Sequence, residues 1–368
     1  MAARTIGVMG RVLDQADGLG IYARHLLQHL TTLDAGSRYV IFLASPAAGA
    51  YFAGQRNIEV RLLESRSRLL WDQVLVPRAA RRAGVDLLFN PKFSLPLLSR
   101  IPGVFILQSC DWYVNPRNYP WWDNIYIRAM LPLYCRKARA MLAISQAALD
   151  DLGRHGLKLP RASVTHAGVG ARFTPQADPE ELRHLRAEYA LPERFILTVG
   201  RVLHTGHGHL PQYPGGNNER LLRAYREYRR RADQPLPLVV AGRQVREYLL
   251  AHGFGTDDLE GVHFPGFVPN ERLHAAYQLA DCFVLATLCE SFGLPILEAL
   301  ASGCPAIVPN TCASPEVAGA AARLIDPYRE DDLTQELLEV TGSQSLRRQM
   351  RAAGLERARR FGWPQAAR

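Results

Sequence analysis

Two glutamates that lie eight positions apart, Glu290 and Glu298, bracket the segment of this chain with the clearest chemistry. Between them, Pro295 stands where a helix is expected to begin, after a short apolar run and a loop. The first turn of such a helix offers unpaired backbone N–H groups and the positive end of the helix dipole, which suit a diphosphate. Gly293 lets a ligand approach the backbone closely. The segment therefore predicts an anion site at the carboxyl end of a strand.

The same two glutamates indicate what else the ligand contains. Glu298 follows Pro295 by three residues, about one turn into the expected helix, so its carboxylate can face the same ligand. Because carboxylates repel phosphate, both are expected to bind neutral hydroxyl groups, Glu290 from the loop and Glu298 from the helix. A diphosphate flanked by hydroxyl groups describes a nucleotide sugar. For Glu298 taken alone, an exposed helix position is the ordinary interpretation.

Further segments occur in a fixed order around this motif. They are Asp17-Gly-Leu-Gly-Ile-Tyr22, His166-Ala-Gly-Val169, Phe195-Ile-Leu-Thr-Val-Gly-Arg201, Val262-His-Phe-Pro-Gly-Phe-Val268 and Ser314-Pro-Glu-Val-Ala-Gly319. Together with the glutamate motif, they closely resemble the family 4 retaining glycosyltransferases (glycosyl transferases group 1) of GT-B fold. The resemblance covers nearly the whole chain.

The resemblance implies a donor site with a role for each matching residue. Glu290 would bind hydroxyls of the donor sugar and Glu298 those of the ribose. Arg201 would neutralise charge on the departing nucleoside diphosphate, a role that suits its permanent charge and forked donors. The remaining donor residues would act through their backbone: Phe292, Gly293 and Leu294 on the phosphates, Gly18 and Gly20 by close approach. Taken alone, these two glycines fit an ordinary strand-to-helix turn and Arg201 fits a surface salt bridge.

The reaction that the resemblance implies is glycosyl transfer with retained anomeric configuration. Stabilising the leaving diphosphate lowers the barrier without a covalent protein intermediate. The chain has no Asp-x-Asp pattern in a suitable loop, because Asp257-Asp258 and Asp331-Asp332 are adjacent pairs. We therefore expect no metal and no cofactor. The expected substrates are a nucleoside diphosphate hexose, mannose among the candidates, and a saccharide or lipid-linked saccharide, in bacterial cell-surface polysaccharide assembly.

The sequence departs from the family pattern at two places. A lysine that usually shares the phosphate charge is absent, since the best match leaves Gly216-Asn217 there, after an apparent insertion containing His204, His207 and His209. In the first domain, Gln108 stands where related proteins commonly have a histidine that meets the reacting sugar. Glutamine hydrogen-bonds a hydroxyl but accepts no proton at neutral pH. A catalytically impaired protein that binds sugar nucleotides as a scaffold or regulator is therefore the alternative function.

The residues that follow Gln108 form the expected acceptor side. Asp111 fits the family pattern as a catalytic residue, and Trp112 begins an aromatic cluster of Tyr113, Tyr119, Trp121, Trp122 and Tyr126. This cluster would stack on sugars, touch a lipid-linked acceptor, or simply pack beneath a neighbouring helix. The basic and apolar stretch 67–83 permits weak docking on an anionic membrane surface, but a solvated basic face is the simpler interpretation.

Short apolar runs alternate with amphipathic ones along the chain, as in repeated βα units around parallel sheets. The class is therefore α/β: two Rossmann-like doubly wound domains that face a central cleft. We expect an acceptor-side domain over 1–174 and a donor domain over 175–368, whose last residues return toward the first domain. The proline-rich and acidic segment Phe173–Glu181 is the expected linker. The expected strands are 5–9, 39–43, 58–62, 86–89, 104–107, 141–144 and 163–166, then 195–199, 238–241, 262–264, 282–285, 306–308 and 323–325.

Composition excludes several other classes of protein. The 368 residues are 48% hydrophobic and have no apolar run long enough for a membrane helix, which predicts a cytoplasmic protein. The net charge of +9 comes mainly from arginine, yet no nucleic-acid-binding motif appears, so a nucleic-acid partner is not expected. No strand-GxGxxG-helix fingerprint of a dehydrogenase is present. The six cysteines have no metal-binding spacing and are expected to be reduced and packed.

Overall fold

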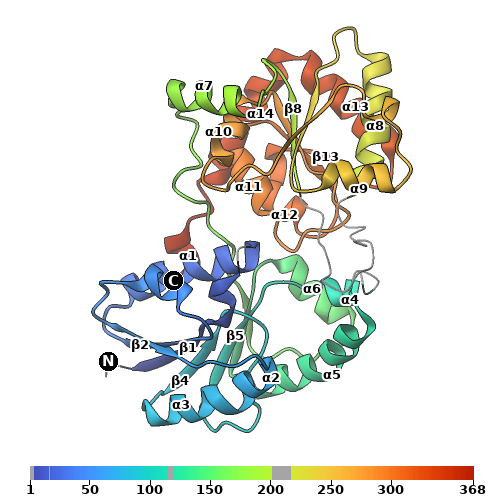
Figure 1. The fold of residues 1–368 in the computed structure, drawn as a ribbon. Coiled ribbons are helices and arrows are strands. Elements are labelled where there is room, and N and C mark those ends of the chain that lie inside the picture. The colour runs from blue at the N-terminus through green and yellow to red at the C-terminus, as the bar shows by residue number, and fades with distance from the viewer. Residues whose placement is uncertain (1–3, 16, 115, 117–118, 201–216) are drawn as a thin grey trace. The chain divides into compact units, whose positions relative to one another are not determined.

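The computed structural model describes residues 4–15, 17–114, 116, 119–200 and 217–368. The chain forms two compact units, each built around one parallel sheet (Figure 1). Unit 1 comprises residues 1–168 and 361–368, and unit 2 comprises residues 169–360. Unit 2 thus begins a few residues before the division that we expected at 174/175.

The sheet of unit 1 has seven parallel strands in the order β3-β2-β1-β4-β5-β6-β7. Its strands are β1 (Thr5–Met9), β2 (Arg38–Leu43), β3 (Ile58–Leu62), β4 (Leu87–Asn90), β5 (Gly103–Leu107), β6 (Ala140–Ala143) and β7 (Ala162–Val164). The chain runs outward from β1 to β3 and then restarts at β4 on the other side of β1. The strand order therefore reverses between β1 and β4.

The sheet of unit 2 repeats this plan with six parallel strands in the order β10-β9-β8-β11-β12-β13. Its strands are β8 (Ile196–Val199), β9 (Leu238–Ala241), β10 (Val262–Gly266), β11 (Cys282–Val284), β12 (Ala306–Pro309) and β13 (Arg323–Ile325). The order reverses between β8 and β11. These two doubly wound sheets confirm the predicted α/β fold class.

All of the predicted strands form, each within two residues of its expected ends. Their sequences are short runs such as Tyr39–Leu43, in which every side chain is buried. Strands of a parallel sheet lie between helical layers, so both of their faces must be apolar. This is why continuous apolar runs located them.

Helices connect the strands in both units (Figure 1). In unit 1 they are α1 (Gly18–Leu33), α2 (Arg68–Leu70), α3 (Val76–Arg82), α4 (Asp111–Val114), α5 (Trp121–Lys137), α6 (Gln146–Arg154) and the C-terminal α15 (Trp363–Ala366). In unit 2 they are α7 (Pro179–Glu188), α8 (Asn218–Arg231), α9 (Val245–Ala251), α10 (Leu273–Leu279), α11 (Leu294–Ala301), α12 (Ser314–Ala318), α13 (Glu330–Gly342) and α14 (Gln344–Ala358).

Two expected segments differ in detail. The basic and apolar stretch 67–83 is helical but irregular, because a π-helical turn over Trp71–Leu75 separates α2 from α3. The end of the expected linker is helical: Asp178 caps α7 by accepting a hydrogen bond from the Glu180 backbone N–H, and Pro179 occupies the first turn. The acids and proline of this segment are thus helix-start signals rather than linker residues.

The last eight residues, 361–368, belong to unit 1. Trp363 lies edge-on to Tyr22 with ring centroids 5.5 Å apart, and it stacks on His25 at 5.1 Å. The Thr165 hydroxyl donates to the Ala366 carbonyl over 2.8 Å. Gly168 is required there, since a Cβ on it would stand 2.2 Å from the Trp363 backbone nitrogen. Helix α15 therefore lies beside α1 (Figure 1).

Candidate functional site

The described donor residues that we predicted in unit 2 lie in the loop and helix that follow β11, at the point where the strand order reverses. In open α/β sheets, ligands bind outside the carboxyl ends of the strands at this switch point. Strand β8 ends at Val199, shortly before Arg201, and the adjacent β11 ends at Val284, shortly before the loop that carries Glu290. The sequence predicted that Arg201 and Glu290 each follow a strand. The structure shows that these two strands, β8 and β11, are neighbours in the sheet.

Helix α11 begins directly after this loop. Gly293 is its N-cap in the left-handed region with φ of 90°, where a Cβ would also stand 2.8 Å from Ile296 Cδ1. A side chain at position 293 is therefore strained by the backbone conformation and would also require Ile296 to shift. Leu294 is the first helical residue and Pro295 the second, one position later than expected. The helix thus presents its N-terminus at the carboxyl end of β11, as an anion site requires.

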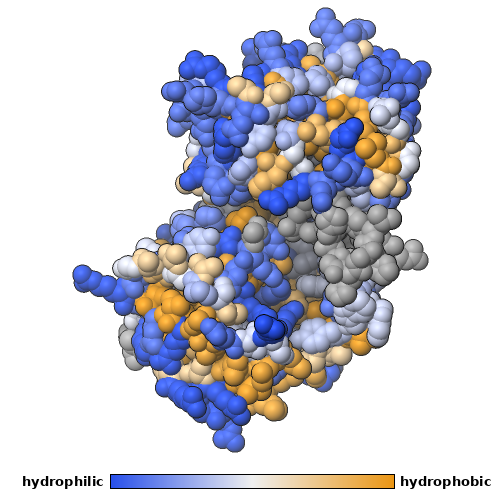
Figure 2. Space-filling view, in the orientation of Figure 1, coloured by the Kyte–Doolittle hydropathy of each residue, from blue (hydrophilic) through white to orange (hydrophobic). Residues whose placement is uncertain are grey.

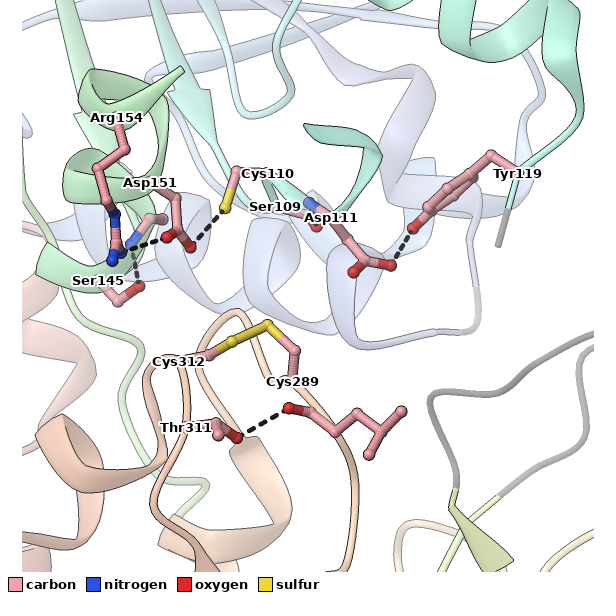
Figure 3. The surroundings of a disulfide bond; sticks show 12 residues. Ser109, Cys110, Asp111, Tyr119, Ser145, Asp151, Arg154, Cys289, Thr311 and Cys312 are labelled. Atoms are coloured by element: carbon pink, nitrogen blue, oxygen red, sulfur yellow. Dashed lines mark hydrogen bonds and ion pairs between the residues drawn. A yellow bond between two sulfur atoms is a disulfide. The ribbon is translucent and has the colours of Figure 1, made fainter. Parts of the chain in front are cut away.

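The loop that carries Glu290 is fixed to the segment before α12. The Glu290 carbonyl accepts from the Ala313 backbone N–H over 3.1 Å, and the Thr311 hydroxyl donates to the Leu288 carbonyl over 2.8 Å. A disulfide between Cys289 and Cys312 joins the same two segments (Figure 3). The backbone on which Glu290 stands is therefore held from the side by several contacts.

This disulfide corrects the prediction that all six cysteines are reduced. The absence of CxxC or metal spacing did not exclude a pair that is distant in sequence, since Cys289 and Cys312 are 23 residues apart. The other four cysteines are free thiols, and all of them are buried, as expected: Cys110, Cys135, Cys282 and Cys304.

Glu298 is buried, with 9% of its surface exposed. Its Oε2 accepts a hydrogen bond from the Tyr277 hydroxyl of α10 over 3.3 Å. Burial raises the pKa of the carboxyl to about 7, and the Tyr277 hydrogen bond opposes that shift. The simple interpretation of Glu298 as an exposed helix residue is therefore wrong. Its contact with a ribose stays a prediction, and a hydroxyl donor there would favour the ionised form.

The glycines of unit 1 lie in the first turn of α1 rather than in an open loop. Asp17 caps the helix, its Oδ1 accepting from the backbone N–H groups of Leu19 and Gly20 over 3.1 Å each. A Cβ on Gly20 would lie 1.9 Å from the Gln15 carbonyl oxygen. Gly20 thus has a packing reason of its own. The approach of Gly18 and Gly20 to a donor stays a prediction.

Gln108 follows β5 and is 4% exposed. Its Nε2 donates to the Pro91 carbonyl over 2.5 Å and to the Leu19 carbonyl over 3.4 Å. Its Oε1 is buried and has no hydrogen-bond partner among the described residues. Because two carbonyls fix the amide nitrogen, the amide oxygen is left as an acceptor for a hydroxyl group.

Asp111 and Trp112 begin α4, beyond Gln108. The Tyr119 hydroxyl donates to Asp111 Oδ2 over 2.9 Å (Figure 3), and Trp112 packs on Phe93 and Tyr119 with ring centroids 5.0 and 5.5 Å apart. The aromatic cluster is therefore divided. Tyr113 and Tyr126 pack into or against a hydrophobic core, whereas Trp121 and Trp122 are 70% and 46% exposed.

Several predicted residues lie outside the described residues: Arg201, Gly216 and the histidines His204, His207 and His209. Asn217 is described, and its side-chain amide donates to the Pro327 carbonyl over 2.7 Å. Within the described part of the chain, no group of three or more His, Cys, Asp or Glu side chains could hold a metal ion. No helix among the described residues is long and apolar enough to cross a membrane.

Sequence reasoning missed the partners that hold the donor loop. Tyr277 lies 21 residues before Glu298 and nothing in the spacing links the two. The positions of Cys289, next to Glu290, and Cys312, just before Ser314, were the available signal for the disulfide. Both cysteines flank the motifs that the resemblance already singled out.

Two family models match the chain. The one described as Glycosyltransferase Family 4 matches residues 16–172, and the one described as Glycosyl transferases group 1 matches residues 213–357. The O-antigen chain mannosyltransferase B of Escherichia coli is 34% identical over 278 residues, which are 74% of this chain and 70% of that protein. The serotype-specific mannosyltransferase WbdA of Escherichia coli is 28% identical over 238 residues, or 63% of this chain. Those residues span only 28% of WbdA.

The fold has solved counterparts. The crystal structure of Anabaena Alr3699/HepE in complex with UDP and glucose has a TM-score of 0.74 at 16% identity, covering 99% of this chain and 97% of that one. The crystal structure of WaaG, a glycosyltransferase involved in lipopolysaccharide biosynthesis, has a TM-score of 0.69 at 14% identity over 96% of this chain and 95% of that one. The chain belongs to the family 4 glycosyltransferases (glycosyl transferases group 1) and has their GT-B fold.

Proposed function

We propose that this glycosyltransferase moves a mannosyl group, with retained anomeric configuration, from a nucleoside diphosphate mannose to a saccharide or lipid-linked saccharide in cell-surface polysaccharide assembly. The observation that carries the donor half is α11, which starts on a left-handed glycine at the switch point of unit 2, with Glu290 in the preceding loop and Glu298 within the helix. The choice of mannose rests on the two Escherichia coli mannosyltransferases.

In this proposal, the charge of each donor-site residue determines which part of the donor it binds. The backbone N–H groups at the start of α11 hold the diphosphate, and Arg201 stabilises the negative charge that builds on it as the sugar leaves. Glu290 orients the sugar hydroxyls, and Glu298 accepts from the ribose. Asp111 and Gln108 act on the acceptor side. Because an arginine and a helix dipole supply the positive charge, the reaction needs no metal ion.

The test is a donor screen that follows release of nucleoside diphosphate. Mannose and glucose donors with guanosine and uridine are each incubated with the protein and a saccharide acceptor, with and without EDTA. We expect release from one mannose donor, undiminished by EDTA, and NMR of the product shows the donor's anomeric configuration. Transfer from a glucose donor alone overturns the choice of mannose, and an inverted product overturns retention.

The buried amide of Gln108 favours one other function. It is bound to two backbone carbonyls and accepts no proton at neutral pH, so it does not replace a histidine as a base. A protein that binds sugar nucleotides as a scaffold gives a thermal shift with a donor but no release with any acceptor. Gln108→His restores a base, so a gain of activity in this variant supports the alternative function, a catalytically impaired protein.

We also propose weak peripheral contact between unit 1 and an anionic membrane surface. Exposed apolar side chains, including Leu69, Leu70, Trp121, Trp122 and Ile125, accompany the exposed Arg66 and Arg128. Figure 2 shows apolar surface over the region of α2. Apolar and basic side chains together favour binding at an anionic interface. Vesicle flotation tests this: recovery is expected with anionic lipid only, and equal recovery with neutral lipid contradicts it.

A further inference from the structure

The switch point of unit 1 collects positive charge. Arg11 lies in the turn that directly follows β1, and Lys92 lies two residues beyond the end of the adjacent β4. Arg68, at the start of α2, packs against the same loop, with its guanidinium 5.0 Å from the Phe93 ring centroid. The strand order thus brings Arg11 and Lys92 to the place where an α/β sheet binds ligands, and packing on Phe93 brings Arg68 to the same loop.

Each of the two arginines has a donor without a hydrogen-bond partner among the described residues. Arg11 Nη1 and Arg68 Nη2 are both buried, and neither has a hydrogen-bond partner in the described part of the chain. A buried donor without a partner is costly, and a charged one more so. The Arg68 side chain as a whole is 40% exposed, and Arg11 and Lys92 are partly exposed.

The negative charge nearby does not balance these cations. Asp72 is 4% exposed and lies 3.8 Å from Arg68 Nε; burial raises the pKa of its carboxyl, and the Ser94 hydrogen bond and the three cations oppose that shift. Asp17 is the other nearby acid, and it caps α1. Burial, Arg68 and Arg11 together lower the pKa of Lys92 to about 8, against the opposing effects of Asp17 and Asp72. The half-buried ammonium is therefore short of negative charge.

The loop that carries Lys92 is held in place by buried polar groups. The Asn90 amide donates to the Ser94 carbonyl over 2.7 Å, and the Lys92 backbone N–H donates to Asn90 Oδ1 over 2.9 Å. The Ser94 hydroxyl donates to Asp72 over 2.8 Å. These hydrogen bonds fix the loop backbone at Lys92, so little further ordering of the backbone is needed when a ligand binds.

Gln108 adds a second kind of contact at this place. It follows β5, the next strand of the sheet, and its Nε2 binds the Pro91 carbonyl, beside Lys92. The unpartnered Oε1 is an acceptor and accepts a hydroxyl, not an anion. Cationic donors next to one neutral acceptor suit a phosphate carried on a hydroxyl-bearing sugar.

We propose that Arg11, Arg68 and Lys92 form a phosphate site at the switch point of unit 1, and that the acceptor of this enzyme is a phosphate-bearing saccharide. This inference adds to the proposed function. It rests on that function in one respect, namely that the phosphate-bearing ligand is the acceptor of the transfer. The site itself rests on the contacts of unit 1 alone.

Lysine acetylation at pH 8, followed by mass spectrometry, tests the site without any turnover. Lys158, which is exposed on unit 1, is the internal control. Inorganic phosphate and methyl phosphate are compared with chloride at equal ionic strength. At ten times its half-protecting concentration, phosphate should slow acetylation of Lys92 about tenfold and leave Lys158 unchanged. Equal protection of both lysines, or protection of neither, overturns the proposal.

A nucleoside diphosphate arm separates the two sources of phosphate. If UDP or GDP protects Lys92 at far lower concentration than methyl phosphate does, the site holds the donor, and the proposal is overturned. The variants Arg11→Met and Arg68→Met should each raise the half-protecting concentration by roughly tenfold or more. Arg68→Lys, which keeps the charge, should raise it less, and thermal melting of each variant checks that it folds.

Transfer assays on the same preparations keep the two proposals apart. Lys92→Met should raise the acceptor KM, whereas Lys158→Met should not. Intact transfer with no phosphate protection overturns this inference and leaves the proposed function standing. Phosphate protection without transfer from any donor overturns the proposed function and leaves the phosphate site standing.

Discussion

The two units share one plan and differ in the side chains that they place where the strand order reverses. In unit 2 the loop beyond β11 carries Glu290, and a covalent bond and a left-handed glycine fix it. In unit 1 the loops beyond β1 and β4 carry Arg11 and Lys92, and hydrogen bonds of Asn90 and Ser94 fix the loop beyond β4. The difference indicates that the sheet topology determines where a ligand binds, whereas the residues of the loops determine which ligand binds there. Carboxylates suit hydroxyls, and cations suit phosphate.

The largest expected effect is a loss of stability in unit 1 that unit 2 does not share. Trp363→Ala should lower the free energy of unfolding of unit 1 by about 3–5 kcal/mol, since a buried aromatic side chain is lost from its contacts with Tyr22 and His25. Urea unfolding followed by hydrogen exchange reports each unit separately. The exposed Trp121→Ala is the control, with a change within about 0.5 kcal/mol. An equal loss in unit 2 would contradict the assignment of residues 361–368 to unit 1.

The second prediction tests the cation that we assign to unit 2. Arg201→Ala should lower kcat by about 100- to 1000-fold with little change in donor affinity, because the charge acts on the departing diphosphate. Turnover and donor binding are measured separately, and Arg201→Lys should keep part of the rate. The control is Arg194→Ala, which removes an exposed ion pair with Asp281. A change in donor affinity alone would show that Arg201 only binds.

The third prediction concerns the covalent bond, which unit 1 does not match among its described residues. Cys289→Ser should lower the free energy of unfolding of oxidised unit 2 by about 3 kcal/mol, because the bond closes a loop of 23 residues. Wild type and variant are compared by chemical unfolding, with and without a reductant. Under reduction the two curves should converge. A gap that persists in reductant would mean that the loss comes from packing and not from the bond.

The smallest effect is the pH dependence from Glu298. Its folded pKa of about 7 is raised above the ordinary 4.5, so the folded state holds this proton more tightly than the unfolded state. The stability from this group is complete below about pH 4.5 and is lost as pH rises toward 7, by at most about 1.4 kcal/mol per pH unit. Glu298→Gln should remove this slope, and the exposed Glu356→Gln should not. Unfolding curves at pH 5, 6, 7 and 8 measure it, and an unchanged slope in Glu298→Gln would refute the assignment.

The sequence located strands and the donor motif because both depend on local patterns. Apolar runs located every predicted strand, and Gly293 and Pro295 marked the start of α11 to within one residue. Contacts between distant segments left no such pattern. The Cys289–Cys312 bond and the gathering of Arg11 with Lys92 depend on which strands are neighbours, and the pairing of Tyr277 with Glu298 depends on how α10 packs on α11. Sequence spacing alone contains no information on which carboxyl ends become neighbours.

The segment 361–368 has a consequence for biosynthesis. Unit 2 is one continuous stretch of chain, whereas unit 1 takes residues from both sides of it. The ribosome therefore emits everything that unit 2 needs while unit 1 still lacks the indole that fills the space against Tyr22 and Gly168. Unit 1 begins to be translated first but is completed last. A nascent chain that stalls after residue 360 therefore leaves unit 1 without the segment that carries Trp363.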